Sequence, residues 1–507
     1  MSFMSAPYQT RYSARASLAK VVIWFFTLII TALMGVALAL GYYQIPLTLL
    51  VLITGLVLIV CPVIGVWVVI VGALFFAGLI DLYIPQLQPL IWGVELLSMS
   101  VGGIGLIKEL FNPRGEIITK ESSGLLLWML LFFVCVVFSS LINWSGLSNF
   151  VVGLKNYFQV WGLLIAIYYL IKTAMDAHRL IGFFVLLGAL QLPFVFHQFL
   201  VLVPARTSAI LAEHGIVAGD IVAGTFGGQM MGGGRSSDLA LLCAITVVFV
   251  LAQWRGGLKK TGPAFLAALF FLLPMFLSEA KLFLILLPIA LILLFSDCIL
   301  RNPFKTIVGT VALSGLMIAI FFSYSLLPVA KSQKSSSLQE MWYQSIEYNI
   351  GNRGYGSAVL NRSTVYPFWF KEHIQNAMLA PILIGDGPGS TKGSGSLSIG
   401  SALNTHYRGY AIGLTGLSSL LWEVGLIGTI IVVTMFFSVF RLGGVLAEKW
   451  QGTLHWPALK TAQISIPLLV VSLLHNNYFV FDICFQTIMI VILSYLLVMT
   501  RFEKSPI

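Results

Sequence analysis

Along most of this chain, apolar residues form runs of about 20 positions, separated by charged or Pro/Gly-rich stretches. A run of this length matches a helix that crosses a bilayer. The runs predict about fourteen such helices, at 21–43, 47–61, 63–82, 88–111, 125–143, 154–171, 180–203, 238–254, 263–278, 282–300, 306–329, 424–440, 461–478 and 481–500. The predicted fold is therefore all-α, a polytopic membrane bundle of helices.

The basic residues predict how the bundle is oriented, because Lys and Arg favour cytoplasmic connections. If the basic segment 1–20 is cytoplasmic, six connections that carry clusters of basic residues also fall on the cytoplasmic side. Their basic residues are Lys108, Arg114, Lys120, Lys172, Arg179, Arg255, Lys259, Lys260, Arg301, Lys305, Arg441, Lys449, Lys460, Arg501 and Lys504. This predicts helices 1–11 over 21–329, an extracytoplasmic loop at 330–423, helices 12–14 over 424–500 and a cytoplasmic tail at 501–507. No small-residue cleavage site follows the first run, so we expect that run to remain as a membrane anchor.

Composition supports this class of protein. Hydrophobic residues make up 58% of the chain and charged residues only 9%, which leaves too little polar surface for a soluble fold of this length. The formal charge of +10 is explained by the cytoplasmic connections and not by a nucleic-acid partner. The five cysteines lie in or beside apolar runs without metal or disulfide spacing and are expected in the core.

The long polar interruption at 330–423 is the first place to expect chemistry, since polar side chains of a membrane protein meet at the membrane face. It contains Arg353, Arg362 and His406. Arginine is suited to gripping a pyrophosphate, and histidine can take a proton from a hydroxyl at neutral pH. Each residue alone also fits a solvated loop position, and His475 is an alternative titrating group. Residues 362–379 have the spacing of an amphipathic surface helix, and 331–337 and 390–401 are predicted loops.

A second polar feature is the glycine-rich run from Gly224 to Gly234, which leads through Arg235 into an apolar helix on the same predicted side. Glycine amides, a helix N-terminus and a guanidinium would together cradle a phosphate. Alternatively the glycines only form turns, a side chain at 236–238 caps the helix, and Arg235 anchors at lipid headgroups.

Lys281 follows Ser278-Glu279-Ala280 in a turn that the alternation of helices also assigns to the outer side. An isolated cation between two apolar helices either holds an anionic substrate or forms a local ion pair with Glu279. The chain lacks a P-loop ending, a cluster with metal-ligand spacing and a Gly-x-Ser-x-Gly elbow. No cofactor or metal is therefore expected.

The order of these motifs resembles the O-antigen ligase and O-antigen polymerase family. The motifs are an outer Gly-Thr-Phe-Gly run, the Ser-x-x-basic turn at Lys281, Arg362-(x)6-Trp369, the run from Pro381 to Ser390, a histidine, and Glu423-Val424-Gly425-Leu426-Ile427-Gly428 opening the next helix. The resemblance covers roughly 220–440 by motif. Two positions depart from the family: Lys281 stands where arginine is usual, and His406 precedes Glu423 by more residues than usual.

The resemblance implies a C-type glycosyltransferase of the bacterial cytoplasmic (inner) membrane. It would transfer glycan from an undecaprenyl-diphosphate carrier to a sugar hydroxyl at the outer face, without metal and with inversion. Arg362 would match the family's loop arginine and His406 its histidine, with Arg235, Lys281 and Arg353 binding pyrophosphate.

The preferred activity is polymerisation of an O-antigen, capsule or exopolysaccharide. Ligation to lipid A-core, a lipid-linked oligosaccharide flippase or carrier, and a non-catalytic scaffold remain alternatives. A carrier is expected to have ionisable residues along a path through the middle of the bilayer. Glu95, Asp297 and Asp482 instead lie mostly near predicted helix ends. The implied partners are the lipid-linked donor, an acceptor glycan, membrane lipid, a flippase and a chain-length regulator, with no nucleic acid.

Overall fold

A computed structural model gives the structure of most of the chain. It describes residues 57–111, 120–206, 218–230, 235–278, 280–326, 358–375, 379–391 and 402–502, and single positions at Thr31, Gly35, Val36, Gly55, Tyr343, Ile346, Glu347, Asn349, Gly351 and Gly354. The chain divides into two units, Met1–Ile64 and Gly65–Ile507. The second unit contains every contact on which the site below depends.

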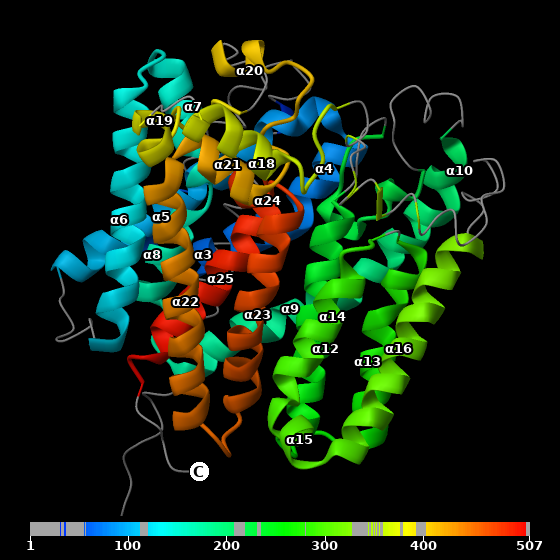
Figure 1. The fold of residues 1–507 in the computed structure, drawn as a ribbon. Coiled ribbons are helices and arrows are strands. Elements are labelled where there is room, and N and C mark those ends of the chain that lie inside the picture. Colours follow the sequence, from blue (N-terminus) through cyan, green and yellow to red (C-terminus); the bar gives the residue numbers. More distant parts are fainter. Residues whose placement is uncertain are drawn as a thin grey trace, which may run out of the picture. The chain divides into compact units, whose positions relative to one another are not determined.

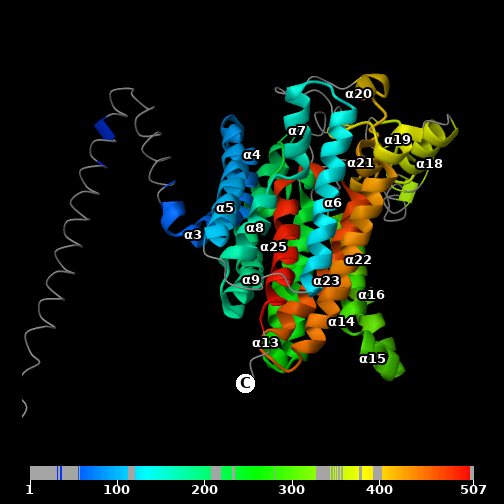
Figure 2. The ribbon, with the colours of Figure 1, turned by 90° about the vertical axis from the view of Figure 1, so that its left-hand side faces the viewer.

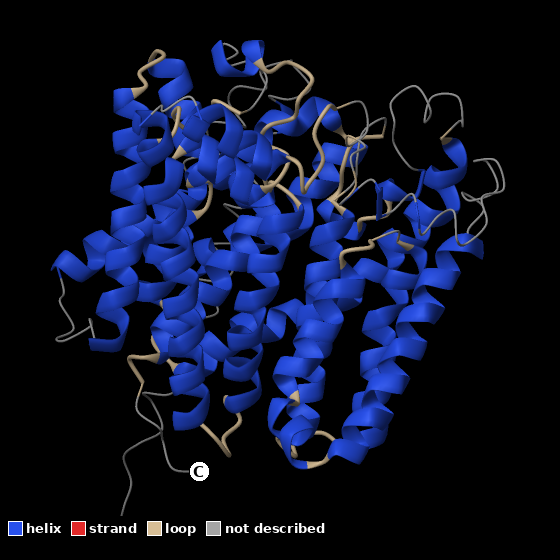
Figure 3. Ribbon diagram, in the orientation of Figure 1, coloured by secondary structure: helices blue, strands red, loops and turns tan. Residues whose placement is uncertain are grey.

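The described residues are helices joined by loops, with no β-strand among them (Figure 3). The helices up to residue 226 are α3 (Pro62–Val71), η1 (Gly72–Phe76), α4 (Ala77–Tyr83), η2 (Pro85–Leu90), α5 (Ile91–Phe111), α6 (Lys120–Ile142), α7 (Leu147–Tyr157), α8 (Trp161–Leu170), α9 (Ala174–His197), η3 (Gln198–Leu202), α10 (Val203–Ala205), η4 (Ala218–Ile221) and η5 (Gly224–Phe226). The later helices are α12 (Ser236–Arg255), α13 (Thr261–Leu277), α14 (Phe283–Leu294), α15 (Ser296–Arg301), α16 (Pro303–Leu326), α18 (Val365–Phe370), η7 (Lys371–Gln375), α19 (Leu379–Ile384), α20 (Ala402–His406), α21 (Gly416–Glu423), α22 (Gly425–Lys449), α23 (Trp456–His475), α24 (Tyr478–Phe481) and α25 (Ile483–Met499). The all-α prediction is confirmed for this part of the chain.

Several of these helices are long and apolar enough to cross a membrane. Among the described residues there are 7, or up to 8 when the bent pair α7 and α8 counts as one span, and four further apolar helices are shorter. This supports a membrane protein. The predicted total of fourteen spans and the predicted orientation remain predictions, and the expected helices at 21–43 and 47–61 lie mostly outside the described residues.

One predicted span, 154–171, is not a continuous helix. α7 and α8 meet at an angle of 50° across a break at Phe158–Val160. The side-chain amide of Gln159, inside the break, donates to the carbonyls of Asn156 and Val480, each at 3.2 Å. A distant segment therefore supplies an acceptor that the local apolar pattern does not reveal. The predicted helix 282–300 is likewise divided, at Phe295, into α14 and α15.

α25 forms the centre of the second unit. Every residue of this helix is buried, and it packs against α8, α9, α22 and α23. Figure 2 shows it running between these neighbours. A helix that is apolar on all sides and fully enclosed contacts protein and not lipid, so residues at its N-terminus are held in the interior by packing on every side.

The predicted outer loop is largely helical where it is described. Within 358–423 it forms α18, η7, α19, α20 and α21, which lie at the end of the second unit opposite α15 (Figures 1 and 2). The helix expected within 362–379 is present as α18 and η7, from Val365 to Gln375. A small core built on Leu360, Val365, Trp369, Ile412 and Trp422 joins these short helices. The loops predicted at 331–337 and over most of 390–401 lie outside the described residues.

Candidate functional site

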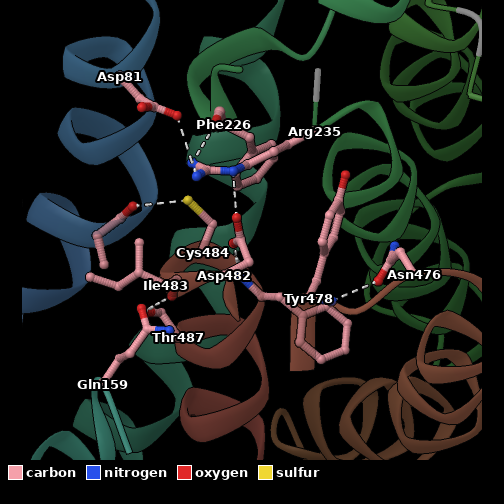
Figure 4. A network of polar contacts seen from close by, with 12 residues as sticks. Asp81, Gln159, Phe226, Arg235, Asn476, Tyr478, Asp482, Ile483, Cys484 and Thr487 are labelled. Atoms are coloured by element: carbon pink, nitrogen blue, oxygen red, sulfur yellow. Dashed lines mark hydrogen bonds and ion pairs between the residues drawn. The ribbon is translucent and has the colours of Figure 1, made fainter. Parts of the chain in front are cut away.

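Arg235 lies immediately before α12, where its guanidinium contacts carboxylates from two distant parts of the chain (Figure 4). Its Nε atom is 2.5 Å from an oxygen of Asp482, and its Nη2 atom is 3.3 Å from an oxygen of Asp81. Its Nη1 atom donates to the carbonyl of Phe226 at 3.2 Å. The side chains of Asp81 and Asp482 are only 7% and 3% exposed. This group is therefore an interior ion-pair cluster.

Asp482 is fixed by a second interaction. Its Oδ1 atom accepts a hydrogen bond from the backbone N–H of Phe485 at 2.9 Å, which caps the N-terminus of α25. The next residue but one, Cys484, donates its thiol to the carbonyl of Ala73 at 3.2 Å. These bonds join the start of α25 to both α12 and the η1 segment.

The glycine-rich segment before Arg235 binds side chains of α9 and its continuation. The amide oxygen of Gln198 accepts from the N–H groups of Ala223 and Gly224 at 2.9 and 2.7 Å. The amide oxygen of Gln191 accepts from Thr225 N–H at 2.7 Å. The backbone donors that a phosphate cradle would need at 223–225 therefore already have acceptors inside the protein.

Close packing explains glycine at 227. This residue has φ = 76°, and a Cβ atom there would lie 2.0 Å from the carbonyl oxygen of Gly78. Only glycine allows the two backbones to approach so closely. The N-cap residue of α12 is Arg235, and no side-chain hydrogen bond caps the helix, so the alternative in which a side chain at 236–238 is the cap is wrong. The glycines at 224 and 227 act as turn and contact residues, while Gly232–Gly234 lie outside the described part of the chain.

Arg362 binds the backbone at His475, where α23 ends, and Asp482 lies at the opposite end of the connection from α23 to α25. Its Nε atom donates to the backbone carbonyl of His475 at 2.6 Å, and its Nη1 atom donates to the side-chain oxygen of Asn349 at 2.5 Å. His475 ends α23, and Asp482 precedes α25. The connection between these helices, residues 475–482, therefore contacts two of the predicted site arginines, Arg362 at one end and Arg235 at the other.

That connection is itself held against the outer segment. The carbonyl of Asn476 accepts from Gly416 N–H at 2.7 Å, and the side chain of Asn477 donates to the carbonyl of Gly413 at 2.9 Å. Gly416 begins α21, whose Thr415 and Ser418 form a reciprocal capping box. The position of α21 is thus coupled to the position of the 475–482 connection.

The run Ile384 to Ser390 encloses a buried carboxylate. Glu423 is 0% exposed, and its Oε2 atom accepts from Gly389 N–H at 2.9 Å. Its Oε1 atom accepts from the N–H and the hydroxyl of Thr391 at 3.2 and 2.5 Å. Burial raises the pKa of Glu423, although these bonds act in the opposite direction. The amides of this glycine-rich run bind an acidic side chain of the protein itself.

A histidine that the sequence did not single out lies beside this run. His373 is 3% exposed; its Nε2 atom is 3.4 Å from an oxygen of Asp386 and its Nδ1 atom is 3.1 Å from the carbonyl of Trp369. Its ring stacks on Trp369 and meets Trp422 edge on, with ring centres 5.1 and 4.5 Å apart. Both ring nitrogens therefore face oxygen atoms of the protein.

A carboxylate and a tyrosine form a second pair nearby. The hydroxyl of Tyr407 donates to Glu372 at 2.8 Å. Burial raises the pKa of Tyr407 to about 12, and the neighbouring carboxylates of Glu372 and Asp386 raise it as well. The outer segment thus brings together two acids, a histidine and a tyrosine.

The remaining predicted site residues are distributed differently. His406 is exposed at the end of α20, where its ring contacts Tyr407 with centres 4.6 Å apart. Lys281 is exposed in the turn before α14. Within the described chain, no hydrogen bond or ion pair joins either residue to Arg235 or Arg362. Arg353 lies outside the described residues.

Three groups were not identified as site residues from the sequence: Asp81, Glu423 and His373. Asp81 and Glu423 lie in otherwise apolar surroundings, and a lone acid at such a position is a signal that a paired, buried role should be expected. For His373 the only signal in the sequence was the spacing of the aromatic residues near it. Asp297 and Glu95 were considered as membrane acids; they pair with Arg255 and with Lys155, the latter at 2.9 Å.

Within the described residues, no group of three or more His, Cys, Asp or Glu side chains could hold a metal ion. Searches with the sequence find no matching protein-family model and no matching curated protein.

Proposed function

We propose that this protein is a membrane glycosyltransferase that extends an envelope or secreted polysaccharide. It would take glycan from an undecaprenyl-diphosphate carrier and pass it to a sugar hydroxyl at the outer face of the bacterial cytoplasmic membrane. The observation that carries the proposal is the binding of Arg362 and Arg235 to opposite ends of the 475–482 connection. This connection is hydrogen-bonded to the helical outer segment, and its helix α24 lies beneath α21 in the view of Figure 1.

The chemistry needs cations at the membrane surface. Departure of a diphosphate leaves negative charge, and fixed guanidinium groups stabilise that charge in the transition state. Arg362 is the first candidate, because it stands where the resembled family has its loop arginine, and its guanidinium donates to the carbonyl of His475 and the side chain of Asn349. Arg235 is already neutralised by Asp482 and Asp81. In this proposal Lys281 and Arg353 supply further positive charge to the pyrophosphate.

The acceptor hydroxyl must lose a proton during the transfer. His406, exposed on the outer segment, is proposed as the base or as the group that orients the acceptor. The buried pair His373 and Asp386 is a second candidate, because Asp386 keeps 23% of its side chain exposed while His373 fixes its position. Attack from the side opposite the departing diphosphate would invert the configuration at the sugar carbon.

The first test is reconstitution in liposomes that contain undecaprenyl-diphosphate-linked repeat units, with a chelator and without nucleotide sugar. We expect gels to resolve a ladder of longer lipid-linked chains. Arg362→Ala should abolish the ladder, and Arg179→Ala, which removes an exposed arginine paired with Asp176, should not. A folded Arg362→Ala protein with full polymer synthesis would overturn the proposed role of Arg362 in binding the diphosphate. If lengthening is absent but glycan appears on added lipid A-core, the protein is a ligase.

A second candidate function is a carrier of lipid-linked oligosaccharide. It is favoured by charged side chains buried among the helices, namely the Arg235 cluster and the pair Lys155–Glu95, and by the 50° break between α7 and α8. A carrier would move the donor across the liposome membrane without lengthening its glycan. A fluorescent donor and an impermeant quencher distinguish the two functions.

A further inference from the structure

Asp238 is a buried acid without a donor. It lies in the first turn of α12, is 1% exposed, and neither of its carboxyl oxygens has a hydrogen-bond partner among the described residues. An ionised carboxylate in this position would be costly, because the interior replaces neither its hydration nor its counter-charge. The carboxyl group of Asp238 must therefore either bind a cation or carry a proton.

The nearest group is another carboxyl. The carboxyl group of Asp238 is close enough to that of Asp482 for their charges to interact. Asp482 already accepts from Phe485 N–H through Oδ1 and binds Arg235 through Oδ2. Two ionised carboxylates in contact repel each other, whereas one protonated carboxyl can donate to its neighbour. The geometry suits one acid and one carboxylate.

The other charged and titratable neighbours do not remove this requirement. The donors of Arg235 go to Asp482, Asp81 and the carbonyl of Phe226, and none goes to Asp238. The thiol of Cys484 is directed at the carbonyl of Ala73 (Figure 4). One guanidinium therefore faces three carboxyl groups. If all three were ionised, two negative charges would be uncompensated, and one bound proton reduces this excess to one.

We propose that Asp238 and Asp482 form a proton-binding site inside the second unit, with the proton on Asp238 and donated to Asp482. Binding converts one carboxylate to a carboxylic acid, and release returns the proton to solvent. Release leaves a third ionised carboxylate beside Arg235, so the guanidinium is held more tightly; protonation weakens that hold. The site follows from the cluster itself and does not depend on the proposed reaction.

The test is infrared spectroscopy of the purified protein in nanodiscs at neutral pH. A protonated carboxyl has a C=O stretching band that is separate from carboxylate bands and shifts in D₂O. We expect Asp238→Asn to lose a band equivalent to one acid group per chain, and Asp482→Asn to lose the same band, because Asp238 can then ionise beside Arg235. Asp176→Asn, at an exposed acid paired with Arg179, is the matched control and should keep the band.

The band should persist when NaCl replaces choline chloride at constant pH. Its loss on adding sodium would identify a metal cation as the occupant and overturn the proton assignment. A wild-type spectrum without any protonated-carboxyl band at neutral pH would also overturn it, and needs no variant to fold. A band that survives in both Asp238→Asn and Asp482→Asn belongs to another acid and would contradict the proposal.

Discussion

Arg235 and Arg362 are both arginines beside apolar helices, yet the contacts described for them differ. Arg235 is bound to two carboxylates that are 7% and 3% exposed. The acceptors of Arg362 among the described residues are the carbonyl of His475 and the side-chain oxygen of Asn349. An arginine paired with two buried acids contributes to folding and has little charge left for a ligand. In the proposed reaction Arg362 is the arginine that binds the diphosphate. The first region is expected to determine stability and the second to determine chemistry.

The largest effect should come from the cluster around Arg235. We expect Arg235→Ala to destabilise the protein by about 3–5 kcal/mol, because it leaves buried acids without their counter-charge. Denaturant unfolding in detergent micelles measures the change. Arg179→Ala, which breaks an exposed pair, should cost at most about 1 kcal/mol. Equal stability of the two variants would remove the distinction between the regions.

The next effect concerns activity at Arg362. Its replacement by alanine should lower the rate of glycan transfer by about 10²–10³-fold, the loss typical of one electrostatic contact to the transition state. The accompanying loss of stability should stay near 1–3 kcal/mol, the range for hydrogen bonds made by a charged group. Arg362→Lys should recover part of the rate, since it restores charge without the planar fork. A rate loss fully explained by unfolded protein would contradict the assignment.

Glu423 provides a smaller and pH-dependent contrast, because this buried carboxylate is held by backbone amides and a hydroxyl. Its pKa in the folded state is raised above the ordinary value of 4.5, mainly by burial. A raised pKa of an acid means that its contribution to stability is complete at low pH and is lost as pH rises through the folded pKa.

Unfolding measured across this range should therefore show wild type losing stability relative to Glu423→Gln as pH rises above 4.5. At lower pH the two should differ by about 1 kcal/mol, the value of one hydrogen bond. If wild type instead gained stability relative to Glu423→Gln as pH rises, the hydrogen bonds from Gly389 and Thr391 to the carboxylate would outweigh the effect of burial.

The smallest effect is expected at Tyr407. Its pKa is raised to about 12 by burial and by Glu372, so it should be among the last tyrosines to ionise in an absorbance titration. Because the folded pKa is raised, its contribution to stability is lost as pH rises from about 10 towards 12. Tyr407→Phe should remove that late step and cost about 1 kcal/mol at neutral pH. A titration that is unchanged in the variant would contradict the Tyr407–Glu372 contact.

The sequence predicted the helices well where a run of apolar residues decides them. The helix expected at 238–254 is Ser236–Arg255, and the one expected at 481–500 is Ile483–Met499. It could not predict the break at Phe158–Val160, because the acceptor on Val480 comes from a segment far along the chain.

The candidate site was predictable only in part, for the same reason. Arg235 and Arg362 were identified by residue type, but their acceptors, Asp482, Asp81 and the carbonyl of His475, depend on tertiary packing. The glycine run from Gly224 to Gly234 was predicted as a possible phosphate cradle, yet the backbone N–H groups of Gly224 and Thr225 bind Gln198 and Gln191. A glycine-rich loop exposes backbone N–H groups that can bind either an acceptor within the protein or an anion from outside. The local sequence does not distinguish these two uses.

The most direct measurement of the proposed glycosyl transfer is the release of undecaprenyl diphosphate by the reconstituted protein, quantified by mass spectrometry beside the number of new glycosidic bonds. We predict that one diphosphate lipid appears for each bond formed, in the presence of a chelator, and that Arg362→Ala suppresses both while Arg179→Ala leaves both unchanged. Movement of an intact donor across the membrane without release of the lipid, with a donor shown to be a substrate for another polymerase, would contradict the account and favour the carrier.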